Sequence, residues 1–175
     1  MNLVRQHDVV DVVLTEHSAQ LGADAETYRN HVMRCLNYYA VLTDSNSVPD
    51  DVALAWAVHD LGIWTAETFD YLGPSALLAR DLAPSLGITN SGHAEELVLG
   101  HHRVLPFSAP DLEAFRRADL VDVSRGVLKQ GLKGSQIKEV VAAFPYVGFH
   151  RFLASGLLAH AVKHPLRPFP MLRVR

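Results

Sequence analysis

The sequence has little cysteine and no excess of basic residues. Cys35 is the one cysteine among 175 residues, which excludes an intramolecular disulfide and is typical of a reducing compartment. We expect it to be a small buried side chain rather than a reactive thiol. The 16 Lys and Arg against 19 Asp and Glu give a net charge of −3, which argues against general binding to nucleic acid or anionic membranes.

Long hydrophobic runs are also missing. No apolar stretch approaches the roughly 20 residues of a transmembrane helix. The first residues, MNLVRQHDVVDVV, turn polar and acidic by position 8, so we expect no signal peptide and a cytoplasmic protein. The partner that we expect is therefore a small-molecule substrate, not nucleic acid or a membrane, and a homodimer is left open.

Hydrophobic residues make up 49% of the chain, enough for the core of one domain. Short breaker groups such as TDSNSVPDD and LPFSAPD separate segments of helical length, and period-two alternation is rare. These patterns predict an all-α single-domain bundle of seven or eight helices over residues 1–164. A tail with three prolines, 165–175, follows, because a helix cannot continue past Pro165 without a break.

Helix start and stop signals support this interpretation at two places. Ser47, Pro49, Asp50 and Asp51 predict a helix start, and Gly62 predicts where that helix stops. In the same way, Ser108, Pro110, Asp111 and Glu113 predict a helix that runs toward Lys129.

A histidine and an aspartate stand together in the most hydrophobic of these segments. Seven apolar residues, Val52 to Val58, precede His59 and Asp60, so the pair belongs to a segment built for burial. An ionised carboxylate buried there costs several kcal/mol or more unless a partner such as a cation compensates it. The other His-Asp pair, His7-Asp8, follows a polar stretch, and we interpret it as ordinary solvated surface.

Further candidates lie far away in the chain. His31 shares a helical stripe with Tyr28, Cys35 and Tyr38, at spacings of three and four residues, so it points along a partly apolar face. Asp119 and Asp122 lie three residues apart in FRRADLVDVSRG, and one of the two carboxylates could face inward.

The order His31, His59-Asp60, Asp119 on separate helices resembles the H…HD…D pattern of the HD-domain metal-dependent phosphohydrolase superfamily. The resemblance covers about residues 28–125 and rests on HV, AVHDLG and RRADLVD. It implies a helical bundle in which His31, His59, Asp60 and Asp119 bind a metal, with Asp122 as the alternative last ligand. It also implies hydrolysis of a small phosphoester or nucleotide.

Two imidazoles and two carboxylates suit Mn²⁺, Fe²⁺, Co²⁺ or Ni²⁺, and Zn²⁺ in an open site. A coordination position left to water would then supply the nucleophile. We name Asp60 and Glu67 as catalytic candidates; Ile63 stands where some nucleotidases of the superfamily carry an acid.

SGHAEELVLGHHRVLPF adds three histidines and an arginine between the two halves of the pattern. On a helix His93 and His101 fall about 80° apart and share a face, while His102 points away. The three histidines are candidates for a second metal or for substrate contact, and Arg103 is a candidate phosphate contact because its guanidinium offers paired donors.

Three other functions remain open. HDLGIWTAETFDYLGPSALLA is similar to the branch of the superfamily that includes cyanamide hydratase, which implies hydration of a small nitrile-like molecule. A small, mostly apolar pocket would favour that branch, and an oxyanion contact would favour the phosphohydrolase. A non-catalytic domain with a structural metal or a signalling ligand, and a mixed-valence di-iron oxygenase, are the remaining alternatives.

Overall fold

The computed structural model describes residues 2–172, and this part of the chain is all-helical, without a strand. Eight of its α-helices have nine residues or more, so the predicted all-α bundle is confirmed. The helices are α1 (Asp8–Glu16), α2 (Ser18–Leu21), the 3₁₀ turn η1 (Gly22–Asp24), α3 (Ala25–Leu42), α4 (Asp50–Val58), α5 (Gly62–Thr65), α6 (Leu72–Leu82), α7 (Ser91–Gly100), α8 (Pro110–Val123), α9 (Gly134–Ala143) and α10 (Phe149–Lys163).

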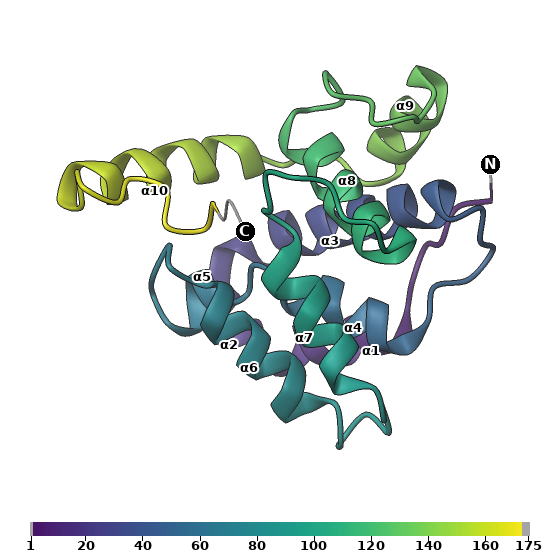
Figure 1. Ribbon diagram of the computed structural model, residues 1–175, viewed down its shortest axis with the longest axis horizontal. Coiled ribbons are helices and arrows are strands. Elements are labelled where there is room, and N and C mark those ends of the chain that lie inside the picture. The colour runs from purple at the N-terminus through teal and green to yellow at the C-terminus, as the bar shows by residue number, and fades with distance from the viewer. Residues whose placement is uncertain (1, 173–175) are drawn as a thin grey trace.

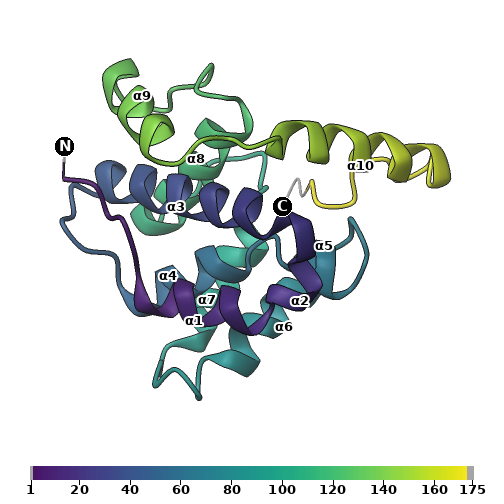
Figure 2. The same cartoon turned by 180° about the vertical axis from the view of Figure 1, so that it is seen from behind.

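Helices α3 and α4 lie at the centre of the bundle. The long α3 packs against α8 on one side and α4 on the other, while α1, α6 and α7 cover the rest of α4 (Figures 1 and 2). Every residue of α4 from Val52 to Val58 is buried, as expected for a helix that is apolar all round. Trp56 stacks on Phe115 of α8 with ring centroids 3.6 Å apart, which joins α4 to α8 next to His59.

Helix α4 starts where the sequence predicts and stops earlier. Pro49 is its N-cap residue and Asp50 opens the first turn, but the helix ends at Val58 and a turn follows. Gly62 is not the stop: it begins α5 instead. A glycine is needed here for close packing, because a Cβ at this position would lie 2.8 Å from both Ser75 Oγ and the Tyr71 carbonyl oxygen.

Helix α8 shows a similar difference at its end. Pro110 occupies the first turn as predicted, although Ala109 is the N-cap residue and no side chain caps the helix. The helix stops at Val123 rather than running toward Lys129. Arg125 and Gly126 both have positive φ, a conformation that ends a right-handed helix.

Helix α10 projects from the body of the bundle (Figures 1 and 2). It ends at Lys163, before Pro165, and the tail then turns back so that Met171 is buried against Tyr71 and Leu72. The last three residues, 173–175, lie outside the described part, and the division at 164/165 stays a prediction. None of the helices in residues 2–172 is long and apolar enough to cross a membrane.

Candidate metal centre

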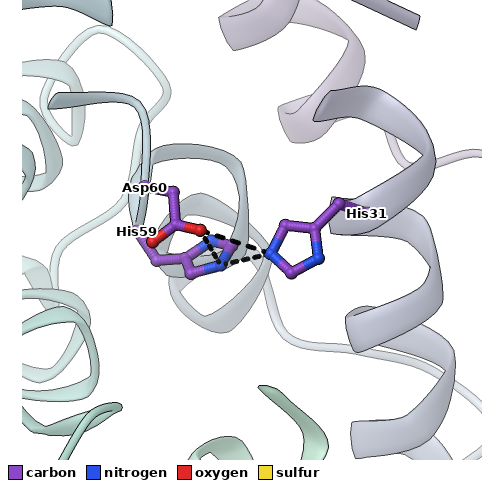
Figure 3. Close-up of side chains that lie close together, drawn as sticks. All are labelled: His31, His59 and Asp60. Atoms are coloured by element: carbon purple, nitrogen blue, oxygen red, sulfur yellow. Dashed lines mark hydrogen bonds and ion pairs between the residues drawn. The ribbon is translucent and has the colours of Figure 1, made fainter. Parts of the chain in front are cut away.

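Side chains from α3 and from the turn after α4 meet in the interior of the bundle. His31 Nε2 lies 2.9 Å from His59 Nε2, and Asp60 Oδ2 lies 3.4 Å from both nitrogens (Figure 3). His31 and His59 are fully buried, and Asp60 is 3% exposed. These three residues form a group of ligand atoms close enough together to hold one metal ion.

The outer nitrogens of these rings determine which tautomer faces the cluster. His31 Nδ1 donates to Asp122 Oδ2 at 2.7 Å, and His59 Nδ1 donates to the Trp56 carbonyl oxygen at 2.8 Å. In a neutral imidazole the other nitrogen then carries a lone pair. When both rings are neutral, two lone pairs point at each other and at Asp60, and a cation or a proton between them relieves the repulsion.

Two more histidines reach the same region from the end of α7. His101 Nδ1 donates to the Val98 carbonyl at 2.7 Å, and its Nε2 lies 3.4 Å from Asp60 Oδ1. His102 Nδ1 lies 3.6 Å from Asp119 Oδ2. The expected orientation of His102 is therefore wrong: α7 ends at Gly100, and the turn that follows brings both adjacent histidines to the cluster.

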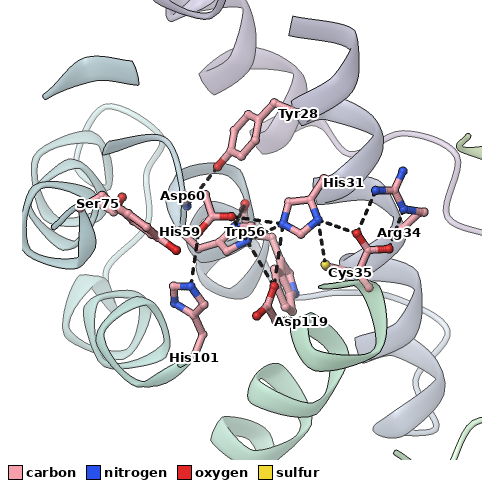
Figure 4. A network of polar contacts seen from close by, with 12 residues as sticks. Tyr28, His31, Arg34, Cys35, Trp56, His59, Asp60, Ser75, His101 and Asp119 are labelled. Atoms are coloured by element: carbon pink, nitrogen blue, oxygen red, sulfur yellow. Dashed lines mark hydrogen bonds and ion pairs between the residues drawn. The ribbon is translucent and has the colours of Figure 1, made fainter. Parts of the chain in front are cut away.

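Asp119 of α8 completes the cluster (Figure 4). Asp122 supports it from outside, where its Oδ2 lies 2.7 Å from His31 Nδ1. Asp119 Oδ1 lies 3.9 Å from His31 Nε2 and 4.0 Å from His59 Nε2. Asp122 faces the opposite side of the His31 ring and accepts two hydrogen bonds from Arg34, at 2.6 and 2.8 Å. Between the two predicted candidates for the last ligand, the geometry places Asp119 nearer to the converging atoms.

Arg34 and Tyr28 are parts of the site that sequence reasoning missed. Arg34 is fully buried and also donates to the Phe144 and Pro145 carbonyls, which holds Asp122 in place. Tyr28 donates to the Ala57 carbonyl at 3.0 Å and accepts from the Asp60 backbone N–H at 3.3 Å, so it fixes the turn that presents Asp60. Their positions on the His31 helix, three residues to either side of it, were the available signal.

Several polar atoms of the cluster have no partner. Asp60 Oδ1, Asp119 Oδ1 and His101 Nε2 are buried without a hydrogen bond among the described residues. Buried polar groups are almost always paired, so unpaired acceptors that converge in this way fit a bound cation. Imidazole nitrogens and carboxylate oxygens are the donors that divalent transition metals accept.

Burial and neighbouring charges shift the pKa values in the cluster. Burial lowers the pKa of His59 to about 3, which keeps its ring neutral and able to coordinate. Burial opposes ionisation of Asp60, but the surrounding imidazoles hold its pKa well below the usual range. Burial raises the pKa of Asp119, and it raises the pKa of the fully buried Cys35 thiol to about 12. Cys35 is thus a buried neutral side chain, as expected.

The remaining predicted site residues lie elsewhere. Both ring nitrogens of His93 contact carboxylates, Asp51 Oδ2 at 2.8 Å and Asp111 Oδ2 at 2.7 Å, so the structure does not bring it into the cluster. Glu67 is exposed and lines a separate hollow. Arg103 packs over the Phe107 ring, 4.6 Å from the centroid.

The other His-Asp pair, His7-Asp8, is only in part the solvated surface that we expected, since Asp8 is exposed but His7 is not. His7 is only partly solvated, because its ring is half-buried and contacts the Val48 carbonyl at 3.1 Å. It lies at the N-terminal end of α1 and takes no part in the cluster.

A cavity of about 220 Å³ adjoins the cluster. Its polar side consists of Asp60, Asp119, Tyr71 and His102, and Tyr71 donates a 2.6 Å hydrogen bond to His102 Nε2. The other residues that line it are all apolar: Phe69, Leu120, Val123, Leu153, Leu157, Phe169, Met171 and Leu172. No Lys or Arg within residues 2–172 lines it. The cluster therefore has one side that a small molecule can reach.

Comparisons with known proteins add no further identification. No protein-family model matches the chain, and neither a curated protein nor a solved structure is detectably similar to it. What stands is an all-helical bundle that encloses a His/Asp cluster able to bind a metal.

Proposed function

We propose that the protein is a metal-dependent enzyme of the HD-domain type that adds water to a small substrate. One observation carries this proposal: the ring nitrogens of His31, His59 and His101 converge on the buried carboxylate of Asp60, whose Oδ1 has no hydrogen-bond partner among the described residues. A divalent cation held there lowers the pKa of a bound water and polarises an electrophile. His31, His59, Asp60 and Asp119 would hold it, and His101 is a further donor.

The surrounding residues support this centre by orienting its ligands. Asp122 and Arg34 hold His31 with its Nε2 toward the cluster, and the Trp56 carbonyl does the same for His59. Such outer partners fix the tautomer of a ligating histidine and raise its basicity. Residues on both sides of the centre are thus arranged before a metal binds, as a preorganised site requires.

The cavity side of the cluster supports catalysis rather than a purely structural metal. Asp60 and Asp119 contribute to the cluster and also line the cavity, so a substrate can approach them. His102 lies between two groups of the cavity, with Nε2 2.6 Å from the Tyr71 oxygen and Nδ1 3.6 Å from Asp119 Oδ2. His102, one of the predicted candidates for substrate contact, lines this cavity, whereas Glu67, the second catalytic candidate, lines a different one.

Two reaction classes remain, and the cavity orders them. Its apolar lining and the position of Arg103 away from it favour the hydration or hydrolysis of a small neutral molecule, such as a nitrile or an amide. The H…HD…D pattern itself favours a small phosphoester or nucleotide, which we keep as the second candidate. A nucleotide needs a larger site, since pockets for molecules of that size usually exceed roughly 300 Å³.

Activity measured on metal-loaded protein tests the proposal. The chain would be loaded separately with Mn²⁺, Fe²⁺, Co²⁺, Ni²⁺ and Zn²⁺ and assayed with nitriles, amides, aryl phosphates and nucleotides. We expect turnover of a neutral substrate with at least one metal, lost at least about 100-fold in His59→Ala and kept in His7→Ala. Equal activity in the two variants, or no turnover with any metal, would overturn it.

We also propose, as the sequence led us to expect, where the protein is located and what it binds. A cytoplasmic location, a small-molecule partner and the absence of nucleic-acid or membrane binding rest on composition alone. A homodimer stays open on the same basis.

A further inference from the structure

The cavity beside the cluster is divided into a polar end and an apolar body. Asp60, Asp119 and His102 lie at the polar end, and Tyr71 closes that end with its hydroxyl bonded to His102. The Tyr71 oxygen lies 2.6 Å from His102 Nε2, so this hydrogen bond engages both groups within the protein. The polar end therefore offers few contacts beyond those of the centre itself.

The apolar body comes from segments far apart in the sequence. Leu153 and Leu157 lie one turn apart on α10, and Phe69 contributes from the loop before α6. The tail returns along this side and supplies Phe169 and Met171. Met171 is 6% exposed and packs with Tyr71, so the tail forms an ordered wall of the cavity.

Charge and size together define what such a cavity accepts. An anion placed against these side chains would lose its hydration without a basic partner among the described residues, which costs several kcal/mol or more. An apolar cavity of roughly 150 Å³ is large enough for a benzene molecule. The 220 Å³ here therefore accommodates a group of that size together with a small polar head.

We propose that the cavity formed by α10, the tail and the Phe69 loop binds an uncharged aromatic or branched aliphatic group of about benzene's size. The substrate class is then a small neutral molecule in which this group lies next to the reactive polar head. The assignment of the reactive head rests on the proposed function, whereas binding of the apolar group does not.

Binding of benzamide, followed by NMR titration of isotopically labelled protein, tests this inference without requiring turnover. Acetamide has the same head without the ring, and phenyl phosphate has the ring with a charged head. We expect benzamide to bind metal-free protein at least about tenfold more tightly than either compound, as ring burial and anion desolvation predict.

Two adjacent leucines of α10 give a matched pair of variants. Leu157 lines the cavity, while Leu158 is 67% exposed and does not. Leu157→Ala should weaken benzamide binding about fivefold, and Leu158→Ala should leave it unchanged. Equal affinity for benzamide and acetamide, tighter binding of phenyl phosphate, or equal effects of the two variants would overturn the inference.

The two proposals can fail separately. Benzamide binding that follows these expectations in a protein without any metal-dependent turnover leaves the apolar site in place and removes the enzyme. Turnover of a neutral substrate that does not change in Leu157→Ala, with no preference for the ring, keeps the enzyme and removes the apolar site.

Discussion

The buried contact between Arg34 and Asp122 predicts opposite roles for the two aspartates of α8. Asp122 accepts three hydrogen bonds, two from Arg34 and one from His31, and all three residues are fully buried. Asp119 Oδ1 has no hydrogen-bond partner among the described residues, and burial raises the pKa of its carboxyl group. Without metal, Asp122 should therefore stabilise the fold and Asp119 should not.

The magnitude follows from the groups that a substitution leaves behind. In Asp122→Asn an NH2 group replaces one carboxylate oxygen, so its N–H groups face either the Arg34 guanidinium or the donor on His31. The Arg34 charge also loses its counter-ion. Breaking one partner of a buried ion pair costs about 3–5 kcal/mol. At about 2–4 °C per kcal/mol for a chain of this size, the melting temperature should fall by about 6–20 °C.

Urea and thermal unfolding in the presence of a chelator, followed by circular dichroism, would measure these effects. Asp119→Asn should change the free energy of unfolding by no more than about 1 kcal/mol, because it removes an unpaired buried carboxylate. The double variant Arg34→Met with Asp122→Leu should cost less than Asp122→Asn alone, since both charges then leave together.

Metal affinity should separate the same two residues in another way. Asp119→Asn removes a proposed ligand. Asp122→Asn keeps all proposed ligands and affects the metal through the orientation of His31, which typically costs 10–100-fold in affinity. If Asp122→Asn destabilised the metal-free protein by less than about 1 kcal/mol, or no more than Asp119→Asn did, the assignment of Asp122 as the supporting residue would be refuted.

Two further predictions concern the frame around the site. Gly62→Ala should destabilise the protein by about 1–3 kcal/mol, because its Cβ would lie 2.8 Å from fixed neighbours, while Gly73→Ala, with no atom within 4 Å, should be neutral or stabilising by up to about 1 kcal/mol in urea unfolding. His93 lies between Asp51 and Asp111; burial opposes its charge, but the two carboxylates raise its pKa. The folded pKa therefore exceeds the unfolded value of about 6.5. His93→Gln should then cost about 1 kcal/mol at pH 6 and progressively less as the pH rises through the folded pKa; a loss that grew with pH would contradict this.

Sequence patterns located the fold class and the elements that carry the site, because hydrophobic spacing and breaker residues act locally. Val52 to Val58 predict a buried helix, and the His59-Asp60 pair at its end needs a compensating partner whatever the tertiary structure. His31 and Asp119 then followed from a pattern of residue order, and the structure places their side chains around that pair.

The errors arose where a helix stops. The predicted orientation of His102 assumed that α7 continues through it, but the helix ends at Gly100, and the turn brings His102 as well as His101 to the cluster. A glycine after an apolar helix is a typical stop signal, which is why Gly62 was predicted to end α4. Only its close contact with α6 shows that packing requires a glycine there. End positions depend on tertiary packing, which local propensity does not contain.

Tertiary contacts also explain what was missed altogether. Arginine is usually exposed, and the partner that explains the burial of Arg34, Asp122, is 88 residues away in the sequence. Tyr71 joins the cavity only because the loop before α6 folds back against the end of α7. The apolar wall from the tail could not be predicted either, since nothing in a proline-rich segment indicates where it returns.

Elemental analysis of purified protein would show whether the buried His/Asp cluster binds a divalent metal. Three proteins should be compared after identical treatment with Mn²⁺, Fe²⁺, Co²⁺, Ni²⁺ or Zn²⁺: wild type, the double variant His59→Ala with Asp60→Ala, and His7→Ala. We expect at least one tightly bound ion per chain in wild type and in His7→Ala, and none in the double variant. Wild-type protein without bound metal under every condition, or a double variant that keeps its metal, would contradict it.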